Sequence, residues 1–345
     1  MEEVTGVSQT DIEKGFQLIC ESVGALQEAL DTSFFDAYIE NQENYLDQQS
    51  VRVIDNVPTK EETAAIEAVY QRLNSLSLTA EDKRKVTQLV LLQGLKEEKI
   101  QPNHQLTPDG IGFLFVYLLE QLAADKKSLT LFDPVVGTGN LLYTIMTNLA
   151  LAGYQTKSYG VDADETLLSI GSVNRDWCEL DTELIHQDSL HPLLIDPVDF
   201  AIADLPVGFY PDDERAAAYK VAAQSGHTYA HHLLMEQAMA HVKADGFGVF
   251  LVPTNFLETD QAGELKNWLL KDVYLQAVLQ LPAVLFKNKD TSKSIIIIQN
   301  PGKTAAQAQE ILLAELPSLK ENQAVISFIN QFRSWREKNI LVEGE

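Results

Sequence analysis

Along the first hundred residues, hydrophobic side chains recur every three or four positions, which is the spacing of amphipathic helices. The clearest segments are residues 11–30, 59–76 and 79–99. Thr59 and Thr79 each precede an acidic turn, as helix N-caps do, and no strand-like alternation intervenes. We therefore predict an all-helical domain over residues 1–103, which ends in the proline-containing segment 99–110.

From residue 104 onwards, short apolar runs alternate with helical stretches, a pattern typical of a doubly wound α/β sheet. The runs with the length and apolar content of buried strands are residues 129–133, 157–162, 183–187, 198–204, 246–252, 275–281 and 294–300. The pattern after about residue 305 indicates mixed helix and strand. We therefore predict a seven-stranded, mostly parallel, Rossmann-like sheet with flanking helices over residues 104–345.

The composition excludes several classes of protein. The chain has 345 residues, of which 45% are hydrophobic, so it can bury a large core and a smaller one. Cys20 and Cys178 lie far apart without a CxxC or Cys/His group, so neither a disulfide nor a metal site is expected. The amino terminus lacks the order of a signal peptide, and no apolar run approaches the roughly 20 residues of a membrane span. We expect a cytoplasmic protein.

The net charge of −24 bears on the partners of the chain. Duplex DNA is held mainly by Lys and Arg contacts to phosphates, so duplex binding is expected to be weak. A simpler interpretation is that the acidity keeps a soluble protein apart from its neighbours. Lysines interpreted as ordinary surface charge are Lys126, Lys127, Lys287, Lys289 and Lys293. A protein partner or a second copy could bind through the helical domain.

The first predicted strand runs into a glycine loop, DPVVGTGNLL, over residues 133–142. Gly137 and Gly139 lie where the strand passes into a helix, the place where open parallel sheets bind ligands. Tight turns need glycine for conformational reasons alone, so the loop by itself is weak evidence. A dinucleotide site needs GxGxxG, and its third glycine is absent here, which disfavours an NAD-dependent oxidoreductase.

Aspartates end or follow the next three predicted strands. Asp162 ends the second strand, about 20 residues past the loop, where a carboxylate can accept hydrogen bonds from ribose hydroxyls of NAD or S-adenosylmethionine. Asp188 follows the third strand, and Asp204 ends the fourth. Carboxyl ends of parallel strands share one edge, so these side chains predict a polar crevice, although Asp188 and Asp204 could also be simple caps.

These segments together resemble a known family. LTPDGIG, DPVVGTGNLL, YGVDAD, QDSL and ADLPVGFY, in that order, resemble the motifs of N6-adenine methyltransferases, especially the modification subunits of type I restriction systems. The resemblance covers roughly residues 104–300 and implies a class I methyltransferase domain that binds S-adenosylmethionine. The chain is also similar to uncharacterised Firmicute-type proteins that carry DLPVG.

The resemblance implies roles for individual residues. Thr107 and Pro108 match the motif beside the methionine carboxylate, Asp162 matches the ribose ligand, and Asp188 the ligand of the adenine amino group. Helix N-terminal amides after Gly139 would face the carboxylate. The residues assigned to the cofactor are Thr107, Pro108, Asp133, Pro134, Gly137, Thr138, Gly139, Asn140, Asp162, Asp188, Ser189, Leu190 and Asp204.

The expected catalytic tetrapeptide departs from the family pattern. The family uses Asp, Asn or Ser, then Pro-Pro and an aromatic residue, to accept hydrogen bonds from an amine and to stack on a flipped base. The matching residues are Asp204, Leu205, Pro206 and Val207. Val207 has no ring, so Phe209 or Tyr210 would have to stack instead, unless both rings simply pack beside Pro211.

Two functions remain open on the sequence alone. The first is methyl transfer to an amino group, with adenine in DNA as the default acceptor and Asp204 holding the amine. The second is a decayed methyltransferase that keeps S-adenosylmethionine and recruits partners through its helical domain. Histidines interpreted as a solvated helix face, and not as metal ligands, are His227, His231 and His232. No target-recognition domain is recognisable after the sheet.

Overall fold

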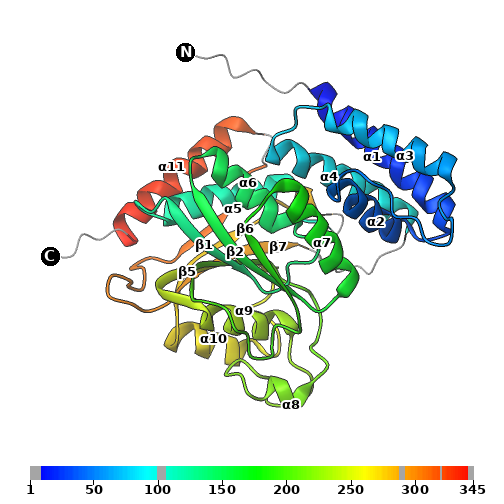
Figure 1. Ribbon diagram of the computed structural model, residues 1–345. Helices are drawn as coiled ribbons and strands as arrows, with labels where there is room; N and C mark the ends of the chain where they lie inside the picture. Colours follow the sequence, from blue (N-terminus) through cyan, green and yellow to red (C-terminus); the bar gives the residue numbers. More distant parts are fainter. Residues whose placement is uncertain (1–8, 99–105, 287–291, 319–320, 341–345) are drawn as a thin grey trace.

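The computed structural model describes residues 9–98, 106–286, 292–318 and 321–340. Its centre is one eight-stranded sheet in the order β3-β2-β1-β4-β5-β7-β6-β8 (Figure 1). The strands are β1 (Ser128–Asp133), β2 (Gln155–Asp162), β3 (Thr182–His186), β4 (Val198–Asp204), β5 (Val242–Pro253), β6 (Tyr274–Gln280), β7 (Lys293–Gln299) and β8 (Leu312–Glu315). β7 runs antiparallel to β5 and β6, and the other pairs of this sheet are parallel.

The predicted mostly parallel α/β sheet is confirmed, but the prediction of seven strands is wrong by one. β8 adds an edge strand that pairs in parallel with β6, so that Ala277 lies opposite Leu312. Only four residues form it, and Leu312 is buried while Leu313 is exposed. So short a run has neither the length nor the continuous apolar character that identifies a buried strand in a sequence.

Helices cover both faces of the sheet and divide the core in two. One face carries α5 (Asp109–Leu122), α6 (Asn140–Leu151) and α11 (Asn322–Asn339), and the other carries α9 (Ala230–Ala240) and α10 (Ala262–Lys271) (Figure 1). Strand β7 shows the division directly. Ile295 and Ile297 belong to the first core, whereas Ile296 and Ile298 belong to the second, because successive side chains of a strand point to opposite faces.

The amino-terminal domain is all-helical, as predicted. Its helices are α1 (Gln9–Leu30), α2 (Phe34–Leu46), α3 (Lys60–Asn74) and α4 (Ala80–Glu97). Thr59 forms a capping box with Glu62, and Thr79 forms one with Asp82, so both predicted N-caps are confirmed. In the ranges that the structure describes, no helix is both long and apolar enough to cross a membrane.

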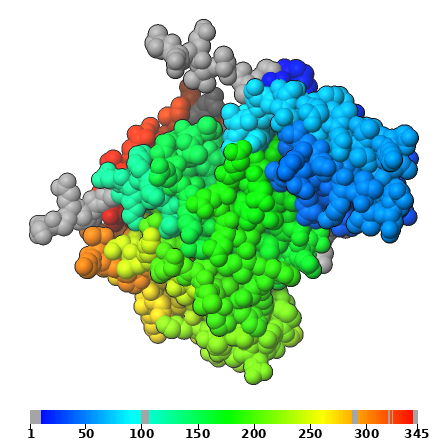
Figure 2. All heavy atoms as spheres, viewed as in Figure 1, coloured from blue at the N-terminus to red at the C-terminus, as the bar shows by residue number. Residues whose placement is uncertain are grey.

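The helical domain shares its core with the helix that follows β2. This helix, α7 (Glu165–Cys178), turns Ile170, Val173 and Trp177 into the apolar interior of the helical domain. α7 therefore packs against strands on one side and against α2 and α4 on the other (Figure 1). Figure 2 shows the helical domain, in blue and cyan, against the green middle part of the chain. The predicted domain boundary between residues 103 and 104 falls in segment 99–105, outside the described residues.

Candidate cofactor and acceptor site

Three aspartates end strands at the same edge of the sheet. Asp133 ends β1, Asp162 ends β2 and Asp204 ends β4, and β1 lies between β2 and β4. Asp133 is only 2% exposed. Its burial raises its pKa well above the usual range, and the charges of Asp162 and Asp204 raise it further. A negative charge on Asp133 is therefore costly at this edge unless a cation lies nearby.

The glycine loop approaches this edge in a conformation that requires glycine. Gly137 and Gly139 have positive φ angles of 52° and 80°. A Cβ atom on Gly139 would lie 2.1 Å from Cε2 of Tyr143, whereas a Cβ on Gly137 would meet open space. Helix α6 begins directly after Gly139, so its first backbone N–H groups have no carbonyl partner within the helix and face the loop. This is a cradle in which a ligand can approach the backbone closely.

Asp162 fastens the loop to the end of β2. The N–H of Gly137 donates to Oδ2 of Asp162 at 2.7 Å, and the N–H of Asp164 donates to Oδ1 at 2.9 Å. Both carboxylate oxygens of Asp162 therefore take part in holding the loop and the start of α7. Asp162 thus has a structural role in addition to the predicted role in ligand binding.

The segment after β3 is fixed to the same site. Asp188 accepts a hydrogen bond from the N–H of Leu190 at 2.9 Å and another from the hydroxyl of Tyr210 at 2.6 Å. The buried Ser189 donates its hydroxyl to the carbonyl of Pro134, at the start of the glycine loop. Leu190 is buried in the core on the α9 side of the sheet. Of Asp188, Ser189 and Leu190, only Asp188 has a polar side chain that is not buried.

Asp204 lies between a hydroxyl and a cation. The hydroxyl of Thr107 donates to Oδ2 of Asp204 at 2.8 Å, and Nζ of Lys293 forms an ion pair with Oδ1. The interpretation of Lys293 as ordinary surface charge is therefore wrong. Its side chain is 23% exposed, and it begins β7, which is antiparallel and so starts at the edge where β4 ends.

The other lysines differ from Lys293. Lys126 is an exposed side chain that pairs with Asp199 at 2.8 Å, and Lys127 lies over the ring of Tyr154. Both lie just before β1, at the end of that strand opposite to Asp133. Lys287 and Lys289 fall in segment 287–291, outside the described residues.

The segment after Asp204 presents one exposed ring. Leu205 is fully buried and donates its N–H to the carbonyl of Leu251, which extends the β4 pairing. Val207 is half exposed, and Phe209 is 56% exposed. Phe209 stacks on Tyr229 with 4.6 Å between ring centroids. Since the Tyr210 hydroxyl is engaged by Asp188, Phe209 is the exposed ring nearest to Asp204 in this segment.

Two of the three histidines do not lie where we predicted them. His231 and His232, in the first turn of α9, are 2% and 0% exposed, so the prediction of a solvated face is wrong for them. Burial lowers the pKa of His231 to about 3 and that of His232 to about 4. His227 precedes α9, is exposed and contacts Asp213 at 2.9 Å. In the described ranges, no three His, Cys, Asp or Glu residues group as a metal site requires.

The segment before α5 completes the site. Pro108 is the N-cap of α5, and the carbonyl of Thr107 accepts a hydrogen bond from Nδ2 of Asn140 at 2.8 Å. Asn140 is the first residue of α6, so Thr107 is held between the glycine loop and Asp204. The structure thus brings the predicted residues of five motifs to one edge.

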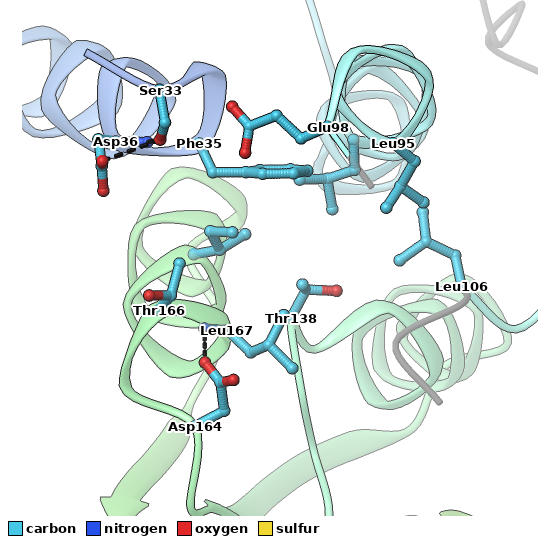
Figure 3. Close-up of a pocket in the computed structure, with 12 residues that line it drawn as sticks. Ser33, Phe35, Asp36, Leu95, Glu98, Leu106, Thr138, Asp164, Thr166 and Leu167 are labelled. Carbon is cyan, nitrogen blue, oxygen red and sulfur yellow. Dashed lines mark hydrogen bonds between the residues drawn. The ribbon is translucent and has the colours of Figure 1, made fainter. Parts of the chain in front are cut away.

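A cavity of about 280 Å³ lies beside this edge, between the helical domain and the glycine loop (Figure 3). Thr138 of the loop, Asp164 and Leu106 form one side of it, and Phe35 and Glu98 of the helical domain form the other. None of the three strand-end aspartates belongs to its lining. The helical domain therefore reaches the loop that follows β1.

The fold and the site define the class of the protein. The chain has a class I methyltransferase fold. Its parallel strands follow the order 3-2-1-4-5, β7 runs antiparallel between β5 and β6, and a glycine loop follows β1. The chain belongs to the N-6 DNA methylase family, whose model matches residues 91–340, and residues 13–95 match the YtxK N-terminal helical domain. It is a methyltransferase with S-adenosylmethionine as its cofactor.

Individual relatives agree with this assignment. The Bacillus subtilis protein named uncharacterized protein YtxK is 38% identical over 323 residues, which cover 94% of this chain and 97% of that protein. A crystal structure from Listeria monocytogenes, described as a candidate class I S-adenosylmethionine-dependent methyltransferase, is 35% identical with a TM-score of 0.86, over 95% of this chain and 99% of that one. A type I restriction-modification methyltransferase subunit from Streptococcus thermophilus shares the fold at 15% identity, with a TM-score of 0.63 over 93% of this chain and 74% of that one.

We predict that the buried histidines make the folded state sensitive to acid. The pKa of each histidine is lower in the folded state than in the unfolded chain, so the unfolded chain binds protons first as the pH falls below about 6.5. From there down to the folded-state pKa, which is about 4 for His232, each such histidine lowers the free energy of unfolding by about 1.4 kcal/mol per pH unit. Urea unfolding between pH 6.5 and 4 should show a shallower decline for His232→Leu than for the wild type. The exposed His227→Leu is the control, and an equal slope in all three proteins would refute this.

Proposed function

We propose that this methyltransferase transfers the methyl group of S-adenosylmethionine to a neutral, planar amine, and that adenine in a nucleic acid is the first acceptor to test. The observation that carries the proposal is the position of Asp204, between the hydroxyl of Thr107 and the ammonium of Lys293. Partly buried contacts hold this carboxylate before any acceptor binds, and such preorganisation is what a transition state with developing charge requires.

The residues around the glycine loop fit the cofactor. The open space at Gly137 and the helix start after Gly139 suit a carboxylate, and Asp162 suits a ribose. Burial raises the pKa of Asp133 although the N–H of Val135 donates to its carboxylate, so a cationic methionine moiety nearby would stabilise the ionised form. When bound, S-adenosylmethionine supplies an electrophilic methyl group on a sulfonium ion.

Asp204 has the chemistry needed to activate an amine. The lone pair of an exocyclic amine is delocalised into its ring, so an acceptor of its N–H hydrogen bonds helps the nitrogen to pyramidalise. In our proposal Asp204 accepts one such bond, and the carbonyl of Leu205 accepts the other. Nζ of Lys293 remains paired with Asp204 and repels a second cation, which disfavours a protonated lysine and favours a neutral amine.

Phe209 is the ring that we propose for stacking on the acceptor. Val207 occupies the position where the family has an aromatic residue, and it offers no π surface. Phe209 lies two residues further on, is exposed, and rests on Tyr229 at the start of α9. The loop is anchored there, because the N–H of Ala230 donates to the carbonyl of Gly208 at 2.9 Å. A base on Phe209 would gain about 1 to 3 kcal/mol from stacking.

The cost of unpairing a base narrows the physical form of the acceptor. The net charge of −24 opposes the phosphates of duplex and single-stranded nucleic acid alike, so charge does not choose between them. An adenine in a single strand needs no unpairing before it enters a pocket. We therefore propose single-stranded nucleic acid as the default acceptor. The binding of a protein partner through the helical domain remains a prediction.

We predict that Asp162→Ala weakens binding of S-adenosylhomocysteine by about tenfold or more, since a buried ribose hydroxyl without an acceptor costs about 1 to 3 kcal/mol. Titration calorimetry measures this affinity directly. The control is Asp164→Ala, which removes a nearby carboxylate that caps α7 through the N–H of Leu167. Equal affinity in Asp162→Ala and the wild type would show that the ribose lies elsewhere.

We predict that Asp204→Ala lowers turnover about 100-fold or more with nearly unchanged affinity for S-adenosylhomocysteine, the scale of losing one preorganised hydrogen-bonding group. Asp204→Asn keeps an acceptor oxygen and should retain part of the activity. The assay incubates the protein with radiolabelled S-adenosylmethionine and separate pools of DNA, RNA, nucleotides and cell protein. If the wild type labels cell protein and Asp204→Ala does not, the acceptor is a protein and not adenine.

We predict that Phe209→Leu lowers kcat/KM for an adenine-containing single strand by about tenfold, because it removes the stacking surface. Val207→Tyr restores the ring of the family and should raise kcat/KM. Tyr210→Phe is the contrasting variant, since it keeps the ring and loses only the bond to Asp188, so it should change cofactor affinity and spare the acceptor. Unchanged kinetics in Phe209→Leu would exclude this ring from the acceptor pocket.

A further inference from the structure

The helical domain contacts the glycine loop through two routes of hydrogen bonds, and the first route runs through α4. Nε2 of Gln88 donates to Oδ1 of Asp109 at 2.6 Å and to Oδ1 of Asn140 at 3.2 Å. Asn140 in turn donates to the carbonyl of Thr107 at 2.8 Å, and Thr107 donates to Asp204. One side chain of the helical domain therefore contacts the residue that opens α6 after the glycine loop.

A buried ion cluster fixes the α4 end of this route. Arg84 is 2% exposed and pairs with Glu81 at 2.8 Å and with Asp109 at 3.0 Å. Glu81 also accepts a hydrogen bond from the hydroxyl of Thr147 on α6, at 2.6 Å. Arg84 holds Asp109 with two parallel N–H groups, a geometry that tolerates little displacement. α4 is thus fixed relative to α5 and α6, on which the site depends.

A second route runs through α2 and α7. The hydroxyl of Tyr38 donates to Oδ1 of Asn174 at 2.6 Å, and Nδ2 of Asn174 donates to the carbonyl of Thr138 at 3.4 Å. Tyr38 and Asn174 are fully or almost fully buried, so losing either bond leaves a polar group without water. The cavity in Figure 3 lies beside Thr138 and is lined by the same domain. The helical domain therefore holds the glycine loop at two points.

We propose that Tyr38 and Gln88 are positioning residues for the cofactor, and that the helical domain is a working part of the cofactor site. They act through Thr138, Asn140 and Thr107 and touch no cofactor atom themselves. The inference rests on the proposed assignment of these three residues to the cofactor. Coupling between two sites is reciprocal, so cofactor binding must also strengthen the docking of the helical domain.

Two tyrosines provide a matched test of the second route. Tyr38 and Tyr70 are both buried in the helical domain, and each donates its hydroxyl to an asparagine, Tyr70 to Asn41 at 3.1 Å. Tyr38→Phe and Tyr70→Phe remove the same group from similar surroundings. We expect both to lower the melting temperature, but only Tyr38→Phe to weaken binding of S-adenosylhomocysteine, by about five- to tenfold, the equivalent of one hydrogen bond.

Two glutamines test the first route in the same way. Gln88→Ala and the similarly sized, uncharged Gln88→Met both remove the donors to Asp109 and Asn140, and both should weaken S-adenosylhomocysteine binding about tenfold. Gln93→Ala on the same helix removes a bond to Glu97 and should bind as the wild type does. If Gln88 acted by packing alone, Gln88→Met would keep wild-type affinity. That result, or equal losses in Gln88→Ala and Gln93→Ala, would overturn the role of Gln88.

The wild-type protein offers a test that needs no variant. Saturating S-adenosylhomocysteine should slow amide hydrogen exchange in α2 and α4 as well as in α6, whereas α3, which packs on α1, should change less. Protection confined to α6 and the loop would overturn the coupling. If Asp162→Ala leaves affinity unchanged, the site assignment itself fails. If Asp162→Ala weakens binding while the Tyr38 and Gln88 variants do not, only the present inference fails.

Discussion

The direction of β7 is the constraint on which the acceptor side of the site depends. In a purely parallel sheet, every strand would end at the ligand edge, and a residue that begins a strand would lie at the opposite edge. β7 runs the other way, so its first residue, Lys293, lies beside the last residue of β4, Asp204. The reversal places a cation among acids, and it gives the Asp204 carboxylate a fixed orientation.

Three strand-end aspartates and Lys293 give this edge a graded polarity. Asp133 is deeply buried, and burial raises its pKa, so a negative charge there is costly unless a cation lies nearby. Asp204 already has a cation in Lys293. In the proposed function, the positively charged cofactor lies nearer Asp133 and the neutral acceptor nearer Asp204, and the two carboxyl groups differ because their environments differ.

The sequence was sufficient to predict seven of the eight strands and the gathering of the motif residues at one edge of the sheet, because strand ends in an open parallel sheet share one side. It failed where the decisive contact joins segments far apart in the chain. Lys293 looked like surface charge, since nothing near it in sequence shows that β7 is reversed. His231 and His232 looked exposed because a polar pair at a helix start is usually solvated, yet here the first turn of α9 packs inward. Tyr38 and Gln88 lie in ordinary amphipathic helices, and only the packed domain shows which helix face meets the glycine loop.

The packing of α7 has a consequence for the independence of the two sequence segments. Ile170, Val173 and Trp177 belong to the methyltransferase segment of the chain but are buried inside the helical domain. A protein cut near residue 103 would expose this apolar surface to water and would lose the partner of Asn174. An unrelated domain therefore could not take the place of the helical domain without loss of these contacts. Any domain that replaced it would have to provide both an apolar surface for α7 and polar contacts to the loop.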